Sequence, residues 1–344
     1  MKSHDFKREL NLILFNNNLL TTTYINMLKK VGMISSYRAL ESRADWLWQQ
    51  TPHPFGTWGN MQMQALAEKP DFLLMYQFDF PQSVKQLSLL DRLRNKQKQP
   101  ELNIYKLLRD VKQERTIYLL REPPLDEIVE MNKRNYQQAK NYCGYISGPD
   151  NSAPTPDYMP AIWYHSNSFK DLNEMPSPEK IAICSWITSG IKRTANHRER
   201  LNFLQSLQSS GMQIDFYGRG LQKWVKTSGE LGNKWYGMAP YYYNLAIENY
   251  AENDWYVSEK LWDSLLAWCL PIYYGGSAAD KLLPPGSFLR LPSLDEKGIA
   301  YIQEITSTSD AWYAAKDAIT EARQIILHKL NLLNWLSEFV TQFS

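Results

Sequence analysis

The sequence predicts an α/β protein with two domains that face each other across a central cleft. Its 344 residues exceed the size at which single hydrophobic cores stop growing, and 44% of them are hydrophobic. Short apolar runs alternate with longer amphipathic runs along most of the chain, a pattern typical of parallel strands separated by helices. Polar segments rich in proline interrupt this alternation near the middle. Each half of the chain therefore contains enough predicted strands and helices to form a domain.

In the first half, several short apolar runs have the length and composition of strands. They are Leu12–Phe15, Phe72–Tyr76, Thr116–Leu120, Tyr142–Ile146 and Ala161–Tyr164. The clearest helix is Leu125–Lys140, which gathers apolar residues loosely on one side. Ser147–Tyr158 and Ser166–Lys180 carry prolines among polar residues and are predicted loops. We expect the domain boundary in the second loop.

The alternation resumes after that loop. The predicted strands are Ile181–Trp186, Gln213–Tyr217, Asn244–Glu248 and Leu270–Tyr274, and the predicted helices are Ala195–Gln208 and Glu259–Trp268. A helical stretch runs from about Ala311 to Phe343. The predicted domains are residues 1–168, residues 169–320 and a C-terminal helix at 321–344, for which packing back onto the first domain is one option.

Charge and cysteine content narrow the classes of function. Thirty-eight basic and 36 acidic residues give a formal net charge of +2, too small for a broad field that attracts nucleic acid or an anionic membrane. The basic clusters Arg92–Lys98 and Lys192–Arg200 are therefore local features. Cys143, Cys184 and Cys269 lie far apart without CxxC spacing, which fits a reducing compartment.

The apolar runs do not predict a membrane protein. All of them fall short of the roughly 18 residues needed to cross a bilayer. The charged segment Met1–Glu9 does not have the character of a signal peptide either. We expect a soluble cytoplasmic protein, and removal of an anchor from the sequence stays open.

Several common catalytic motifs are missing. The glycine pair in Tyr217-Gly-Arg-Gly220 follows a predicted strand, but Lys223 occupies the third glycine position, which disfavours a Rossmann oxidoreductase. The sequence has no Walker A, GxSxG or HExxH motif, and its five histidines are too dispersed to predict a metal site. It also lacks the Asp-x-Asp pair that presents carboxylates to a divalent cation on a nucleotide diphosphate. A bound diphosphate would therefore need side-chain cations and helix amides.

Lys260 occupies an unfavourable position at the start of a predicted helix. Ser258 is a good N-cap and Glu259 suits the positive end of the helix dipole, but a lysine in the first turn opposes that dipole by roughly 0.3–1 kcal/mol. A bound anion would reverse this penalty. Taken alone, the position is better explained by a solvated surface lysine that tolerates this small penalty. The helix that follows is apolar on most of its surface, which predicts that it is buried. We therefore expect its start to point from a strand end into the cleft.

Three segments resemble the α1,3/4-fucosyltransferases, glycosyltransferase family 10. The longest covers about 45 residues and joins Asn244-Leu-Ala-Ile-Glu-Asn249, Tyr256-Val-Ser-Glu-Lys260, Leu270-Pro-Ile-Tyr-Tyr-Gly275 and Leu283-Pro-Pro-Gly-Ser-Phe288 in order. The second is Arg198-Glu-Arg200-Leu followed by Ile214-Asp-Phe-Tyr-Gly218. The third is Tyr118-Leu-Leu-Arg-Glu122-Pro-Pro in the first half.

The resemblance implies a soluble, bacterial-type enzyme with a GT-B fold of two Rossmann-like domains. Such an enzyme transfers fucose from GDP-fucose, with inversion, to a hydroxyl of an N-acetylglucosamine- or glucose-containing glycan, which makes GDP-fucose and an oligosaccharide acceptor the expected partners. Glu122 is the implied general base, with an exposed acid in a Glu-Pro-Pro turn as the alternative. Donor binding is implied for a group in the second half, namely Arg200, Gly218, Arg219, Glu248, Asn249, Tyr256, Ser258, Glu259 and Lys260.

Lys260 and Arg200 are expected to stabilise the GDP leaving group without a metal cofactor. Arg198 competes with Arg200 for this role, and Arg200 has a structural alternative in a surface pair with Glu199 or Asp215. Loosely bound Mn²⁺ or Mg²⁺, peripheral membrane association and the oligomeric state stay open. Two alternative functions also remain, a GT-B transferase that uses another nucleotide sugar and a non-catalytic glycan-binding protein.

Overall fold

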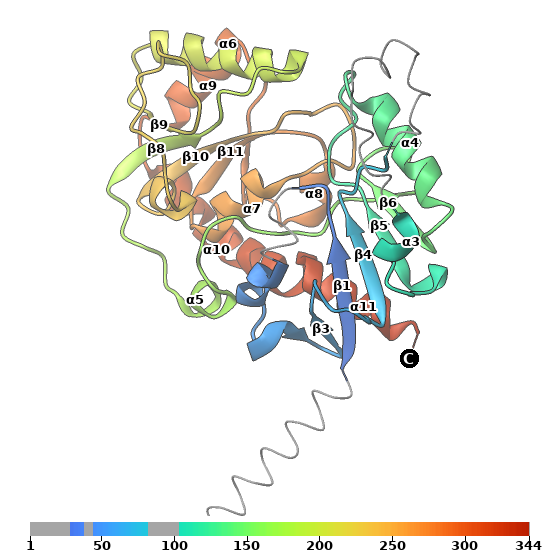
Figure 1. The fold of residues 1–344 in the computed structure, drawn as a ribbon. Helices are drawn as coiled ribbons and strands as arrows, with labels where there is room; N and C mark the ends of the chain where they lie inside the picture. The colour runs from blue at the N-terminus through green and yellow to red at the C-terminus, as the bar shows by residue number, and fades with distance from the viewer. Residues whose placement is uncertain (1–27, 38–43, 82–102, 344) are drawn as a thin grey trace, which may run out of the picture.

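The structure is a computed structural model that describes residues 28–37, 44–81 and 103–343. These residues form two separate sheets, one in each half of the chain (Figure 1). The first has the strand order β2-β3-β1-β4-β5-β6-β7 and is parallel except for the β2–β3 pair. Its strands are β1 (Lys29–Ile34), β2 (Thr57–Trp58), β3 (Met61–Met63), β4 (Phe72–Tyr76), β5 (Thr116–Leu119), β6 (Tyr145–Gly148) and β7 (Thr155–Pro156).

The second sheet is parallel throughout, in the order β12-β11-β10-β8-β9. Its strands are β8 (Ala182–Ile187), β9 (Asp215–Tyr217), β10 (Tyr241–Ile247), β11 (Leu270–Tyr274) and β12 (Leu289–Arg290). Because parallel sheets are covered by helices on both faces, their central strands are apolar on both sides. All five residues of β4 are buried, as are six of the seven in β10.

Helices of very different length connect these strands. The α-helices are α3 (Ile104–Leu107), α4 (Val129–Ala139), α5 (Phe169–Glu174), α6 (Ala195–Ser209), α7 (Glu259–Leu266), α8 (Ala278–Leu282), α9 (Glu296–Ile305), α10 (Asp310–Ile325) and α11 (Leu332–Thr341). Short 3-10 turns occur at Ala44–Gln50, Pro54–Gly56, Gln113–Arg115 and Lys234–Gly237. Both α6 and α7 follow a strand of the second sheet, so their first turns lie near the carboxyl ends of the strands.

The C-terminal helices join the two halves of the molecule. A π-helical segment, Ile326–Leu330, ends α10, and the Asn331 side chain then caps α11 by accepting from the Leu333 and Asn334 amides at 3.0 and 2.8 Å. The apolar face of α11 packs into the core of the first sheet, whereas α10 belongs to the core of the second. In Figure 1 these red helices run from one sheet to the other. The predicted start of the C-terminal segment, at residue 321, stays a proposal, and the break between the last two helices lies at Asn331.

Most predicted elements are confirmed to within a few residues. The predicted strands Phe72–Tyr76 and Leu270–Tyr274 match β4 and β11 residue for residue. The predicted strand Tyr142–Ile146 begins too early, since the Tyr142 and Cys143 amides still donate to Ala139 at the end of α4. The predicted continuous helix from Ala311 to Phe343 is interrupted at Asn331.

Two other predictions need correction, and one strand was missed. Ala161–Tyr164 is not a strand: its first three residues are buried in the two cores, and only Ala161 forms a bridge, with Asn331. The predicted loop Ser166–Lys180 contains α5, which a capping box between Ser168 and Asp171 begins. Strand β1 was not predicted, because two lysines and a glycine weaken its apolar pattern. The predicted strand Leu12–Phe15 and the basic cluster Arg92–Lys98 lie outside the described residues.

Candidate active site

Two adjoining cavities lie at the carboxyl ends of the strands. The larger, of about 930 Å³, is lined by both halves of the chain, including Glu122 and Tyr164 from the first and Tyr256 from the second. The smaller, of about 260 Å³, lies within the second half, where Arg200 and Gly218 line it. Residues that line both cavities include Arg219, Lys234, Asn249, Glu259 and Lys260. The two cavities therefore share part of their walls.

The start of α7 is organised by a buried carboxylate. Glu248, at the end of β10, has a fully buried side chain and accepts from the Ser258 amide at 2.8 Å, the Ser258 hydroxyl at 2.6 Å and the Lys260 ammonium at 3.2 Å. Ser258 is the N-cap of α7, as the sequence predicts. Glu248 lines neither cavity. In this structure its carboxylate holds the helix start rather than facing the cleft.

Lys260 combines that pairing with access to the cleft. Its ammonium lies 3.1 Å from the Ser258 hydroxyl, its side chain keeps 21% of its surface exposed, and it lines both cavities. The carboxylate of Glu248 offsets the unfavourable interaction of this lysine with the helix dipole. Lys260 therefore places an ordered, partly exposed cation at the edge of the cleft.

Arg200 is a buried cation that has no anionic partner in the described part of the chain. It lies on α6 with 3% of its surface exposed, and donates to the Asn249 side chain at 2.5 Å and to the Ser189 carbonyl at 3.0 Å. Burial lowers its pKa to about 10. The Nε atom is buried without a partner. The predicted alternative, an ion pair with Glu199 or Asp215, does not form.

Arg198 is placed differently from Arg200. It is exposed, lines neither cavity, and donates to the carbonyls of Lys192 and Arg193 at 3.4 Å. Of the two competing arginines, only Arg200 lines a cavity.

The turn after β9 brings backbone close to the smaller cavity. Gly218 has φ of +155°, and a Cβ there would lie 1.7 Å from the Thr188 carbonyl oxygen. Only glycine fits this position. The exposed Arg219 that follows lines both cavities.

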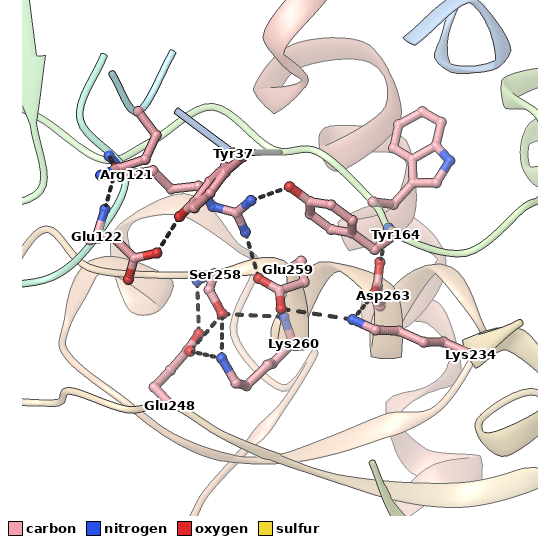
Figure 2. Close-up of polar contacts among 12 residues, drawn as sticks. Tyr37, Arg121, Glu122, Tyr164, Lys234, Glu248, Ser258, Glu259, Lys260 and Asp263 are labelled. Carbon is pink, nitrogen blue, oxygen red and sulfur yellow. Dashed lines mark hydrogen bonds and ion pairs between the residues drawn. The ribbon is translucent and has the colours of Figure 1, made fainter. Parts of the chain in front are cut away.

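Glu122 follows β5 and lines the larger cavity, as Lys260 of the second half does. Its backbone amide donates to the Gln77 side chain at 3.1 Å, and its carboxylate accepts from the Tyr37 hydroxyl (Figure 2). Burial and the neighbouring Glu122 charge raise the pKa of Tyr37, so this hydroxyl stays protonated and donates. Glu122 is thus ordered at the cavity wall rather than in a free surface turn.

An ionic network crosses the cleft beside these groups. Arg121 donates to Glu259 at 2.6 Å and to the Tyr164 hydroxyl, and Figure 2 shows its guanidinium pointing between them. Lys234 lies 3.7 Å from Glu259 and 3.1 Å from Asp263. Burial alone would raise the pKa of Glu259, but the three cations Lys260, Lys234 and Arg121 hold it well below its usual range. Glu259 is therefore ionised and already paired.

Sequence reasoning missed several residues of this site. Tyr37, Arg121, Tyr164, Lys234 and Asp263 belong to the cavity walls or to their ionic network, but were not predicted. Arg121 had a signal, because it directly precedes Glu122 at a strand end. Tyr256, which was predicted, is 6% exposed and lines the larger cavity.

Two further features of the described residues bear on the site's class. No group of three or more His, Cys, Asp or Glu side chains there is placed to hold a metal ion. Among the same residues, no helix combines the length and apolarity required to cross a membrane.

The second half of the chain matches a known family. Residues 177–314 match the model described as Glycosyltransferase family 10 (fucosyltransferase) C-term. This segment, less than half of the chain, is similar to the C-terminal part of family 10 fucosyltransferases. The match supports the resemblance predicted from the sequence, and the matched range contains all the predicted donor-binding residues from Arg200 to Lys260.

Two solved structures are similar to most of the chain. An α1,3-fucosyltransferase with GDP-fucose is 17% identical, with 86% of this chain and 82% of that chain covered and a TM-score of 0.41. An α-glucosyltransferase in complex with UDP and a 13-mer DNA containing a HMU base is 10% identical, with 92% and 98% covered and a TM-score of 0.53. The second likeness shows the fold alone. Together with the two parallel sheets, it confirms the predicted GT-B fold.

Proposed function

We propose that the protein transfers fucose from GDP-fucose, with inversion, to a hydroxyl of an N-acetylglucosamine- or glucose-containing glycan. The observation that carries this proposal is Arg200. Within the segment similar to family 10, it is a buried guanidinium without a carboxylate partner among the described residues, and it lines a cavity. Burying an unpaired charge is costly, and an anionic ligand removes that cost. The diphosphate of a nucleotide sugar is such an anion.

Lys260 supplies the second cation of the proposed donor site. It lines the same cavity as Arg200, and its pairing with Glu248 and Ser258 fixes its side chain before a ligand arrives. Fixed charges directed at a developing negative charge contribute most when they need no reorganisation. We assign Lys260 and Arg200 to the GDP leaving group, assisted by the backbone amides at the start of α7.

The remaining predicted donor-binding residues lie in different parts of the site, and we assign them different roles. Asn249 orients the Arg200 guanidinium, and the exposed Arg219 lines both cavities. Gly218 lets the chain approach the nucleotide. Tyr256 and Glu259 line the larger cavity, where a sugar or ribose would lie. We reassign Glu248 from a donor-binding residue to a positioning residue for Ser258 and Lys260, because its carboxylate is buried and already accepts hydrogen bonds from both.

Glu122 is the proposed general base. It takes the proton from the acceptor hydroxyl as that oxygen bonds to the anomeric carbon from the face opposite the diphosphate. The bond from the anomeric carbon to the diphosphate oxygen breaks, and GDP leaves with the electron pair. The Tyr37 hydroxyl orients the Glu122 carboxylate for this step. No step requires a metal cofactor, so stimulation by Mn²⁺ or Mg²⁺ is a separate question for experiment.

A nucleotide panel tests the choice of donor. GDP, UDP, CDP and ADP are added to the protein, and thermal unfolding is monitored. A nucleotide at 100 times its Kd stabilises the protein by about 2.7 kcal/mol. We expect the largest increase in Tm with GDP. An increase confined to UDP would replace the proposed donor with another nucleotide sugar.

A turnover assay separates an enzyme from a binding protein. GDP release from GDP-fucose is measured with lactose, N-acetyllactosamine and related acceptors. Acceptor-dependent release supports the transferase. Binding of GDP without any release, across the panel, would indicate a non-catalytic glycan-binding protein.

The setting of the reaction is also a proposal. We assign the enzyme to the cytoplasm and to glycan biosynthesis such as that of lipopolysaccharide. The buried free thiols of Cys143, Cys184 and Cys269 fit a reducing compartment. Cell fractionation tests the compartment, and recovery in a secreted fraction would contradict it.

A further inference from the structure

One ion pair joins the two sides of the proposed reaction centre. Arg121 follows β5 of the first sheet, and Glu259 is the first residue of α7 beside the second sheet. The Arg121 guanidinium lies 2.6 Å from the Glu259 carboxylate, with only 16% and 20% of their side chains exposed. A pair with so little exposure is screened less than a surface pair. It is therefore a shielded contact between the two halves of the chain.

The residues that follow the paired ones are the proposed chemical groups. Glu122, the base, is the next residue after Arg121, and Lys260, a leaving-group cation, is the next after Glu259. An adjustment of the Arg121–Glu259 contact consequently moves the base relative to the leaving group. No other ion pair in the described part of the chain connects the neighbours of these two groups.

Both partners are held on their own side of the cleft. The Gln77 side chain accepts from the amides of Arg121 and Glu122 at 2.8 and 3.1 Å, which fixes the strand end. On the other side, Lys234 lies 3.7 Å from Glu259. The pair thus connects two ordered elements rather than two mobile side chains.

Tyr164 adds a third contact to Arg121. The Arg121 guanidinium lies 5.0 Å from the centroid of the Tyr164 ring and also donates to its hydroxyl. The Tyr164 amide in turn donates to Asp263 of α7 at 2.9 Å. The guanidinium is therefore fixed by both its ion pair and an aromatic residue that α7 itself holds.

We propose that Arg121 is a positioning residue that sets the separation between the general base and the leaving-group cations. This inference rests on the proposed function. Its physical basis is that a misplacement of about 1 Å between reacting groups costs on the order of 10²-fold in rate. The leaving-group cations Arg200 and Lys260 belong to the second domain and neither pairs with Arg121, so the affinity for GDP should depend little on this constraint.

The test compares Arg121→Gln with Arg121→Lys. The glutamine variant keeps a polar side chain but loses the charge, whereas the lysine variant retains the charge and restores part of the contact. We expect Arg121→Gln to lower kcat for fucosyl transfer about 10- to 10²-fold, with the Kd for GDP within about twofold of wild type. Arg121→Lys should recover part of this loss.

Donor hydrolysis supplies a readout that a purely structural defect would not change. Water enters the cleft in many orientations. Cleavage of GDP-fucose without acceptor therefore depends less on how the two domains are placed relative to each other. The ratio of hydrolysis to transfer should rise at least about fivefold in Arg121→Gln.

Asn151→Ala is the matched control. It removes another contact between the domains, the 2.7 Å hydrogen bond from the Trp255 indole, and neither residue lines a cavity. Transfer by Asn151→Ala should stay within about twofold of wild type. An equal loss in both variants would overturn the proposal, because it would show general loosening of the interface.

Two other results would also overturn the positioning role. One is transfer by folded Arg121→Gln at the wild-type rate. The other is a fall in GDP affinity as large as the fall in transfer, which would make Arg121 a donor ligand. Failure of the proposed function is recognised separately, since wild-type protein would then transfer no fucose, and this result would remove the inference as well.

Discussion

The ammonium of Lys260 lies 3.2 Å from the buried carboxylate of Glu248, one at the start of α7 and the other at the end of β10. This pair explains how a lysine is tolerated in a first helical turn. The carboxylate supplies the negative charge that the helix dipole and the lysine both require. The remaining exposed part of Lys260 faces the cavities. A fixed cation at this place leads to the first prediction.

Lys260→Ala is expected to lose roughly 10²- to 10³-fold in kcat, because it removes a charge that stabilises the departing diphosphate. The measurement is steady-state fucosyl transfer, with circular dichroism to confirm folding. Lys260→Arg serves as the control that keeps the charge. Near-normal turnover by a folded Lys260→Ala would contradict the assigned role.

Glu122→Gln is expected to keep GDP affinity and lose about 10²- to 10⁴-fold in transfer. The amide preserves the shape of the side chain but accepts no proton from the acceptor. Calorimetric titration with GDP and a transfer assay check the two parts separately. If GDP binding fell while transfer per bound donor stayed intact, Glu122 would not be the base.

Arg200→Met should affect binding and stability in opposite directions. Removal of the buried cation should weaken GDP binding by at least about tenfold. The Tm of the ligand-free protein should stay the same or rise, since burial of an unpaired charge is costly and functional sites commonly reduce stability. A large loss of Tm without GDP would show that Arg200 is mainly structural.

Glu259→Gln should destabilise the protein in a pH-dependent way. The folded-state pKa of Glu259 lies well below its usual value, so its charge stabilises the fold above the unfolded pKa, and this contribution is lost as the pH falls toward the folded pKa. The Tm difference between wild type and Glu259→Gln should thus be full at pH 7 and shrink between about pH 5 and pH 3. A difference that grew on acidification would contradict the pairing.

The sequence determined the order of most strands and helices because their patterns are local. The runs at Phe72–Tyr76 and Leu270–Tyr274 are apolar enough to define their own boundaries. Ser258 could be predicted as an N-cap because capping depends only on the first turn. The resemblance to family 10 then supplied the donor segment as a unit.

Only the tertiary structure decided which polar residues meet. Glu248 has the appearance of an exposed strand-end acid in the sequence, but three donors from the start of α7 enclose it. Arg121 and Glu259 are separated by 138 residues and become partners only when the domains face each other. Local sequence does not encode such distances, since burial and pairing of charged groups depend on neighbours supplied by other elements. The sequence by itself therefore determined the kind of domain and the candidate chemistry, whereas the packing of the domains decided which charges are paired and which face the cavity.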